Sequence, residues 1–175
     1  MNLLKIKKLV LSEQTHNWCR LPYPNHPNGC PMYNKKYDCP PHNLHFNLYF
    51  DLNKPLYFVY SEFDLATHAK KMKLKHPYWT KRQCRNLLYW QSQSRKQVRE
   101  YALEAMWHIG CNYVTPCPEA LGVNVFATCL KSGLKLDKTK NINICRHIIF
   151  IGWKKNILKK EDSNVQTNGS WICNK

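Results

Sequence analysis

The segment from Thr15 to His45 constrains the fold of this chain more than any other. It contains six prolines and three cysteines but only one glycine. Proline fixes φ and has no backbone N–H, so the segment excludes a regular helix and a central strand. Loops of this length without secondary structure are uncommon in compact domains. We therefore expect another interaction to organise the segment, and a bound metal would do so.

Three of the nine cysteines are followed directly by proline, at Cys30-Pro31, Cys39-Pro40 and Cys117-Pro118. Chance pairing of nine cysteines with ten prolines in 175 residues gives fewer than one such pair. A proline after a ligating cysteine turns the chain away from the metal, and Cys-Pro ends cluster-binding loops in ferredoxins. The pairs favour a thiolate-bound metal centre over a disulfide framework. The alternative is that they only mark turns in a loop-rich chain.

The candidate metal ligands fall into two groups, which must meet in space if they share one centre. The first loop contributes Cys19, Cys30 and Cys39, and the second contributes Cys111 and Cys117. None of the spacings is C-x2-C, so the choice between zinc and an iron–sulfur cluster stays open, since four thiolates satisfy either. Four histidines flank the first loop and could each replace a thiolate: His16, His26, His42 and His45. We expect Cys84, Cys129 and Cys145 to be small buried hydrophobes, and Cys173 lies near the end of the chain.

The charge balance is strongly basic, with 27 Lys and Arg against 11 Asp and Glu and a net charge of +16. Such an excess favours polyanionic partners, namely RNA, DNA or an acidic protein, although a generally basic proteome would produce the same bias. Between Lys70 and Arg99 basic residues alternate with Tyr78, Trp79, Tyr89 and Trp90, a mixture suited to phosphate contact and base stacking. The candidate nucleic-acid contacts are Lys81, Arg82, Arg85, Arg95, Lys96 and Arg99.

The chain shows no apolar leader with a cleavage site and no apolar run of the roughly 18 residues that would span a bilayer. We therefore expect a soluble cytoplasmic protein without a membrane partner, in a compartment that keeps thiols reduced. Its length fits one domain, which we predict to comprise residues 1–153, followed by a polar tail over residues 154–175.

The pattern of apolar residues predicts an α+β fold with a small sheet packed by one long and two short helices. Strands are expected within residues 1–11, at Leu56–Phe63 and at Ile142–Trp153. One short helix begins after Asp64, and the long helix runs from Lys81 to about Ile109 between a Thr80 cap and Gly110. The predicted inward stripe of the long helix is Cys84, Leu87, Trp90, Val98, Tyr101 and Ala105. A second short helix covers Asn124–Ser132 and ends at Gly133.

Two motifs resemble those of a widespread prokaryotic family known as predicted metal-binding proteins of unknown function. Residues 29–41 (GCPMYNKKYDCPP) resemble the family element CPxYGxxxxCPP, with Asn34 where glycine is usual. Residues 118–133 (PEALGVNVFATCLKSG) resemble its PSxEAxGIDVF region, and the order of loops, helices and closing strand also agrees. The resemblance implies that Cys30, Cys39, Cys111 and Cys117 bind the metal, with Cys19 as a fifth candidate. It implies no reaction.

These observations lead to two functional hypotheses. The first is a protein that holds one 4Fe-4S cluster and acts in electron transfer, with a redox partner protein, or in cluster-dependent chemistry. The second is a nucleic-acid-binding module held together by a structural zinc. A metal-independent enzyme has little support, since the sequence contains no P-loop, GxGxxG, HExxH or nucleophile elbow. Glu119, next to Pro118 in the second loop, is a candidate functional carboxylate near the metal, and the alternative is that it caps the following turn.

Overall fold

A computed structural model of the protein describes residues 1–22, 26–35, 39–42, 46–137 and 142–155. The strands are β1 (Asn2–Lys5), β2 (Tyr57–Asp64), β3 (Tyr113–Thr115) and β4 (Ile144–Gly152). The helices are α1 (Gln14–Trp18), α2 (Leu65–Lys75), α3 (Lys81–Cys84), α4 (Gln91–Ile109) and α5 (Val125–Ser132). Three short 3-10 turns complete the described part, η1 (Phe46–Leu48), η2 (Leu87–Tyr89) and η3 (Pro118–Leu121).

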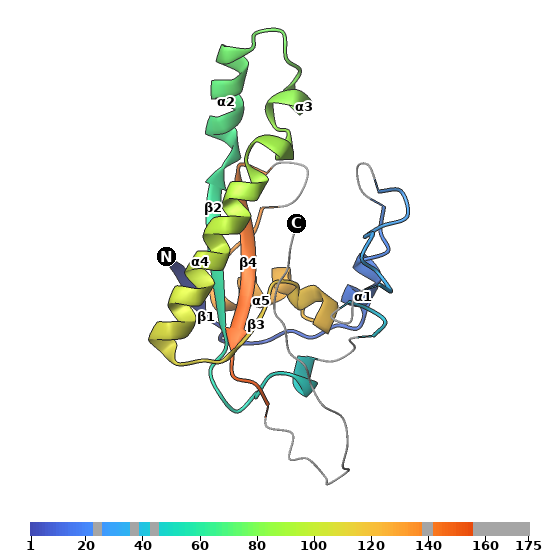
Figure 1. The fold of residues 1–175 in the computed structure, drawn as a ribbon, viewed down its shortest axis with the longest axis vertical. Helices are drawn as coiled ribbons and strands as arrows, with labels where there is room; N and C mark the ends of the chain where they lie inside the picture. The colour runs from blue at the N-terminus through green and yellow to red at the C-terminus, as the bar shows by residue number, and fades with distance from the viewer. Residues whose placement is uncertain (23–25, 36–38, 43–45, 138–141, 156–175) are drawn as a thin grey trace.

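The four strands form one antiparallel sheet in the order β1-β2-β4-β3 (Figure 1). The long central pair β2 and β4 aligns Tyr57 with Ile151 and Asp64 with Ile144. These two strands were predicted because their aromatic and β-branched residues form nearly continuous apolar runs. β3 was not predicted, because three residues within a cysteine loop carry too little periodicity to be recognised.

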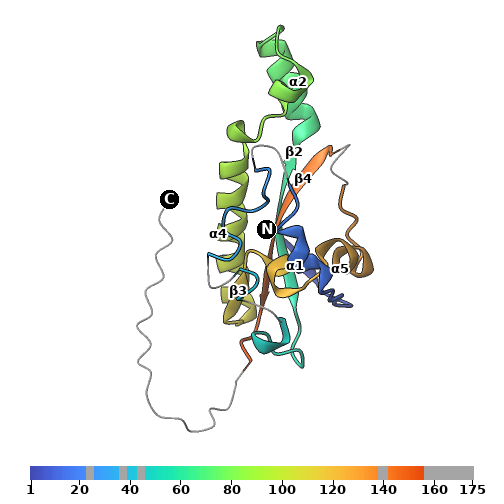
Figure 2. The same cartoon turned by 90° about the vertical axis from the view of Figure 1, so that its right-hand side faces the viewer.

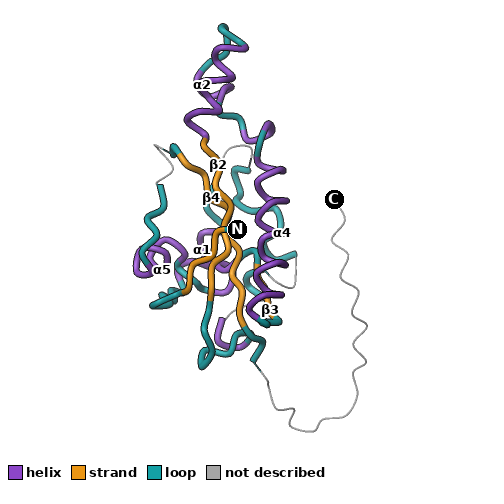
Figure 3. The backbone as a smooth tube through the Cα atoms, turned by 90° about the vertical axis from the view of Figure 1, so that its left-hand side faces the viewer, coloured by secondary structure: helices purple, strands orange, loops and turns teal. Residues whose placement is uncertain are grey.

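Helices cover both faces of the sheet, α4 on one side and α5 on the other (Figures 2 and 3). The face toward α5 is aromatic, and Phe150 meets Phe46, Phe50 and Phe58 in edge-to-face contacts. The face toward α4 is aliphatic, with Val59, Ile149 and Ile151 packed against Val98, Ala102 and Ala105. This two-sided burial confirms the α+β class and explains why the central strands do not alternate with polar residues.

A short chain of buried hydroxyls fixes α4 to the sheet. The Ser61 hydroxyl on β2 donates to the Ser94 carbonyl at 3.0 Å and lies 2.9 Å from the Ser94 hydroxyl. The Ser94 hydroxyl in turn lies 2.9 Å from Nδ1 of His147 on β4. Burial, together with the charge of Arg95, lowers the pKa of His147, so the imidazole is held in its neutral form. The polar interruption at Ser94 is therefore a specific link between a helix and two strands.

The prediction of one continuous long helix from Lys81 to Ile109 is wrong. The structure divides it into α3, η2 and α4, with the break at Arg85–Trp90. Asn86 starts the η2 turn by accepting a hydrogen bond from the Leu88 N–H, and Trp90 leaves helical geometry at φ −146°. The break places the Trp90 ring against Phe63, with stacked centroids 4.6 Å apart. It also turns Leu87, which belonged to the predicted inward stripe, out to 51% exposure.

The caps that the sequence predicted are present. Asp64 accepts a hydrogen bond from the Thr67 N–H at 2.8 Å, and Thr80 forms a capping box with Gln83. Asn124, which the sequence pattern placed inside the helix, instead caps α5 by accepting a hydrogen bond from the Ala127 N–H. Gly110 and Gly133 end α4 and α5 in the left-handed conformation. Side-chain caps therefore determine where three of the five described helices begin, and glycine determines where two of them end.

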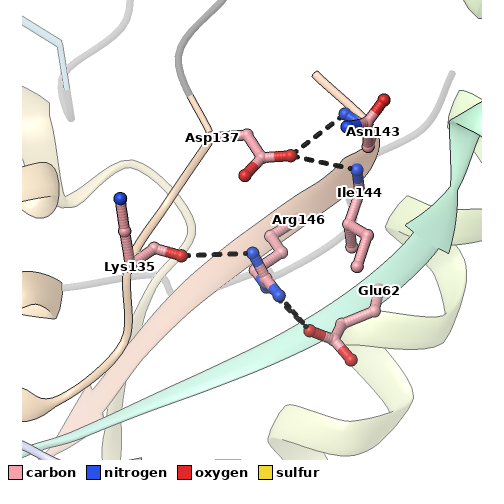
Figure 4. A network of polar contacts seen from close by, with 6 residues as sticks. All are labelled: Glu62, Lys135, Asp137, Asn143, Ile144 and Arg146. Carbon is pink, nitrogen blue, oxygen red and sulfur yellow. Dashed lines mark hydrogen bonds and ion pairs between the residues drawn. The ribbon is translucent and has the colours of Figure 1, made fainter. Parts of the chain in front are cut away.

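A network of polar contacts holds the segment that leads into β4 (Figure 4). The Asp137 carboxylate accepts hydrogen bonds from the N–H groups of Asn143 and Ile144, at 3.0 and 3.2 Å. Arg146 forms a cross-strand ion pair with Glu62, with Nη2 2.6 Å from the carboxylate, and donates to the Lys135 carbonyl. The two backbone hydrogen bonds are the main reason that the pKa of Asp137 is lowered.

The described chain ends in contact with the body of the fold. Lys154 N–H donates to the Asn112 side chain, and Lys155 N–H donates to the Tyr49 carbonyl. The rest of the predicted tail, residues 156–175, lies outside the described residues, and so does Cys173. Within the described part of the chain, no helix has the length and apolar character needed to cross a membrane.

Candidate metal centre

The first cysteine loop is closed by a tight backbone approach between Cys19 and Cys30. Cys19 follows the last residue of α1, and its carbonyl accepts a hydrogen bond of 2.7 Å from the Cys30 N–H. The preceding Gly29 has φ +81°, and a Cβ there would lie 2.5 Å from the Cys19 carbonyl oxygen. Only glycine fits such a position. The sequence Gly-Cys at 29–30 therefore brings two candidate ligands together.

A second turn links Cys30 to Cys39. The Tyr33 N–H donates to the Cys30 carbonyl, and the Asn34 N–H donates to the Pro40 carbonyl at 2.9 Å. Asn34 lies in the left-handed region at φ +56°, which asparagine tolerates better than other non-glycine residues. Asn34 is thus compatible with the backbone conformation of this turn.

The second cysteine loop rests on the first one. Cys117 precedes η3, and its carbonyl accepts a hydrogen bond from the Ala120 N–H. η3 packs against α1, and the Gly122 carbonyl that follows η3 accepts from the Ser12 N–H at 2.8 Å. A Cβ at Gly122 would lie 3.4 Å from Nε2 of His16. This packing sets Cys117 beside the end of α1, where Cys19 lies.

The causes of two raised pKa values indicate that four thiols from the two loops lie near one another. The pKa of Cys117 is raised to about 11 first by burial and then by the charges of Glu119, Cys39, Cys19 and Cys30. The pKa of Cys19 is raised by burial and then by Cys30, Cys39 and Glu119. Cys117 keeps an exposed surface, although the surrounding protein desolvates its thiol. We refer to Cys19, Cys30, Cys39 and Cys117 as the four-cysteine cluster.

The chemistry of the four-cysteine cluster suits a cation that binds soft ligands. Burial and neighbouring charges raise the pKa values of Cys19 and Cys117, so these two thiols are protonated at neutral pH, and a metal ion would favour their thiolate forms. Among the described residues, no group of three or more His, Cys, Asp or Glu side chains is arranged so that it could hold a metal ion. Metal binding would therefore require the loops to draw the four sulfurs closer together.

Glu119 is the acidic residue whose charge contributes to the raised pKa values of Cys19 and Cys117. Burial raises the pKa of its carboxyl, while a backbone hydrogen bond opposes the shift. Burial is the main cause that raises the pKa of Cys129 on α5 to about 12, and the charge of Glu119 adds to this shift. Next to a bound metal, a carboxyl of this kind would be a proton donor or acceptor.

Cys111 lies apart from the four-cysteine cluster. It is buried on the α4 side of the sheet with Val59, Val98 and Ile151. Burial is the largest cause of its raised pKa, and no other cysteine is among the causes. Its surroundings are those of a small hydrophobe. The structure thus brings together four of the five candidate ligands and leaves the fifth in the aliphatic core.

The sequence predicts that Cys84, Cys129 and Cys145 are small buried hydrophobes, and the structure buries them to different degrees. Cys84 and Cys129 are fully buried on α3 and α5. Cys145 on β4 is half-buried. The Cys-Pro pairs separate Cys30, Cys39 and Cys117 from Cys111, but no sequence signal separated Cys111 from Cys19, since neither is followed by proline.

The six candidate nucleic-acid contacts lie on α3, on α4 and in the segment between them. Lys81 and Arg82 are exposed on α3, whereas Arg95, Lys96 and Arg99 are exposed along α4. Lys96 lies 3.9 Å from Glu100. Arg85 is half-buried and donates to the Ile142 carbonyl, so its role in the structure is internal. Trp90, only 3% exposed, belongs to the core as the helical stripe predicted.

Comparison of the chain with protein-family models, with curated proteins and with solved structures finds no match. The resemblance of residues 29–41 and 118–133 to the prokaryotic metal-binding family therefore stays a prediction.

Proposed function

We propose that the protein binds a metal centre through the thiolates of Cys19, Cys30, Cys39 and Cys117. The observation that carries the proposal is the packing that joins two loops far apart in the sequence: the Cys30 N–H donates to the Cys19 carbonyl, and η3, which follows Cys117, packs against α1. The raised pKa values of Cys19 and Cys117, to which the charges of the other cluster thiols contribute, agree with this arrangement. Four neighbouring thiols form a complete ligand set for a tetrahedral zinc or a four-iron cluster. The proposed set contains Cys19 in place of Cys111, because Cys111 lies in the aliphatic core.

The prolines that follow the ligands support this assignment. Pro40 and Pro118 are both fully buried, so the residues directly after Cys39 and Cys117 are fixed in the protein. A buried proline ring holds the backbone at its fixed φ, which limits where the preceding thiol can point. Such restraint lowers the entropy cost of gathering ligands from irregular loops.

A 4Fe-4S cluster is the form of metal that we favour. The Cys-Pro pairs are typical of cluster loops, and the absence of C-x2-C pairs in the sequence departs from the common zinc ribbons. The cluster would supply one-electron chemistry, and a redox partner protein would then exchange electrons with it. The reducing cytoplasm is the compartment in which such thiolates persist.

A structural zinc is the second candidate for the same four thiolates. In that case the metal would only tie η3 and α1 to the first cysteine loop, and the function would reside elsewhere on the surface. A protein with a zinc ion and a protein with a 4Fe-4S cluster differ in iron content and colour. Anaerobically purified protein with a cluster should be brown, with broad absorbance near ~400 nm. A colourless protein with one zinc per chain would exclude the cluster.

Single substitutions test which cysteines bind the metal. Cys19→Ser, Cys30→Ser, Cys39→Ser and Cys117→Ser should each lose most of the bound metal per folded chain. Cys111→Ala is the matched control, because it also removes a thiol but preserves a small apolar side chain in the core. We expect Cys111→Ala to retain the full metal content. Metal loss in Cys111→Ala with retention in Cys19→Ser would contradict the proposed ligand set.

A further inference from the structure

Helices α2 and α3 form a hairpin that projects beyond the end of the sheet (Figures 1 and 3). We define the basic hairpin as residues 65–89, which include α2, α3 and η2. It contains seven Lys and Arg residues and no Asp or Glu. The two helices pack on each other, and the hairpin contributes no residue to the four-cysteine cluster. A projecting segment whose charged residues are all Lys and Arg attracts polyanions.

Two of the seven basic side chains have structural roles. Lys73 Nζ donates to the carbonyls of Pro77 and Trp79, at 2.6 and 2.8 Å, and so holds the tip of the hairpin. Arg85 donates to the Ile142 carbonyl. The other five are exposed, and none of them takes part in a salt bridge among the described residues: Lys70, Lys71, Lys75, Lys81 and Arg82.

Aromatic rings are stacked across the hairpin. The His76 and Trp79 rings lie 4.0 Å apart and nearly parallel, and Trp79 continues onto Tyr89 at 5.5 Å. Tyr89 is 52% exposed, and Tyr78 at the tip is 98% exposed. Lys73 fixes the backbone on both sides of Tyr78. The hairpin therefore presents aromatic rings on a supported scaffold, surrounded by positive charge.

We propose that the basic hairpin binds single-stranded nucleic acid. Phosphates would contact the five exposed basic residues, and unpaired bases would stack on Tyr78 and on the outer face of Tyr89. Aromatic faces contribute to binding only when bases are unpaired, which favours single strands over duplexes. The complete lack of acidic residues over the hairpin favours a polyanion over an ordinary protein partner. This inference does not depend on which metal the four cysteines bind.

The test measures binding of full-length purified protein to labelled oligonucleotides by fluorescence anisotropy over a range of salt concentrations. The probes are a mixed-sequence single-stranded RNA, the DNA of the same sequence, and the duplex of that DNA. We expect both single strands to bind more tightly than the duplex. Comparison of the two single strands shows whether the 2′-hydroxyl contributes.

Two triple variants separate the hairpin from general positive charge. Lys75→Gln, Lys81→Gln and Arg82→Gln together should lower the slope of log affinity against log salt by up to about 2, since each phosphate contact on a single strand contributes about 0.7. The matched control removes the same charge elsewhere, through Lys5→Gln, Lys7→Gln and Lys8→Gln, and should leave the slope nearly unchanged. Equal losses in the two variants would overturn the proposal.

A third variant tests base stacking separately from charge. Tyr78→Ala should weaken single-strand binding by about 5- to 150-fold, as expected for one stacked base, without changing the salt slope. Duplex binding as tight as single-strand binding, together with an inert Tyr78→Ala, would reject the stacking role. Self-association that is abolished by Tyr78→Ala, with no affinity for the oligonucleotides, would instead identify the hairpin as a protein interface.

Discussion

Replacement of Gly29 by alanine should disrupt the candidate metal centre while leaving most of the fold intact. The new Cβ would lie 2.5 Å from the Cys19 carbonyl oxygen and 2.7 Å from the Arg20 carbonyl carbon. Both are backbone atoms, so relief of the clash requires Cys19 to move away from Cys30. The left-handed backbone at φ +81° adds strain for any residue with a Cβ.

Gly110→Ala is the matched control for this substitution. Its φ of +76° is nearly the same, but no atom lies within 4 Å of the added Cβ. Each alanine should cost about 1–2 kcal/mol in left-handed strain. Gly29→Ala should cost a further 1–3 kcal/mol or so from overpacking. The difference between the two variants isolates the contact between Cys19 and Gly29.

Two measurements compare Gly29→Ala with Gly110→Ala, one of metal affinity and one of stability. Competition with a chelator should show metal binding weakened by about 5- to 150-fold in Gly29→Ala relative to Gly110→Ala, which is 1–3 kcal/mol converted at 1.4 kcal/mol per factor of ten. Urea denaturation of the metal-free proteins shows how much of the cost falls on the fold. If both variants bind the metal equally well, the close approach of Cys19 and Cys30 does not shape the site.

Three further predictions concern the packing of α4 and the entry into β4. Ser94→Ala removes the hydroxyl between Ser61 and His147 and should lower the free energy of unfolding by about 1–3 kcal/mol, because it leaves buried polar groups without a partner; denaturant titration measures this. The lowered pKa of His147 means that its neutral form stabilises the fold above its ordinary pKa of 6.5 and that this contribution is lost as the pH falls through the lowered value. His147→Gln should flatten that part of the stability profile, and an unchanged slope below pH 6.5 would contradict a buried neutral imidazole. The lowered pKa of Asp137 likewise gives stability that is present above pH 3.8 and lost as the pH falls through the folded-state value. Asp137→Ala should therefore destabilise the protein at neutral pH and reduce its acid sensitivity, and equal acid sensitivity in variant and parent would argue against the hydrogen bonds to Asn143 and Ile144.

Features of the fold that depend on local chemistry could be predicted from the sequence. Asp64 and Thr80 cap helices because their short polar side chains reach nearby N–H groups. The strands β2 and β4 were predicted because burial on both faces leaves an apolar run. In each case the determining interactions lie within a few residues along the chain.

Features that depend on tertiary contacts were missed. The break between α3 and α4 accompanies the stacking of Trp90 on Phe63, and helical periodicity contains no sign of it. β3 forms only because β4 offers an edge at Phe150–Gly152. Tertiary packing overrides local pattern in both cases.

In the candidate site, too, local sequence signals identified some residues, and tertiary contacts determine the position of the others. The Cys-Pro pairs singled out Cys30, Cys39 and Cys117 from the sequence, and all three are members of the four-cysteine cluster. Cys19 carries no proline, and its position depends on the hydrogen bond with Cys30 across the loop. Cys111 lies close to Cys117 in the sequence, but the intervening strand β3 separates their surroundings. Proximity in sequence is thus a poor guide to a shared site when a strand intervenes.

Protection of individual cysteines from alkylation tests the proposed metal centre most directly. The metal-loaded protein and the chelated protein are treated with a thiol reagent at about pH 9, where the raised-pKa thiols begin to react, and each cysteine is quantified by mass spectrometry. We predict that chelation increases the labelling of Cys19, Cys30, Cys39 and Cys117 together, while the half-buried Cys145 is labelled equally in both states. Cys117 is the most informative, because it is the most exposed member of the four-cysteine cluster. Equal labelling of Cys117 before and after chelation would contradict a metal centre at the four-cysteine cluster.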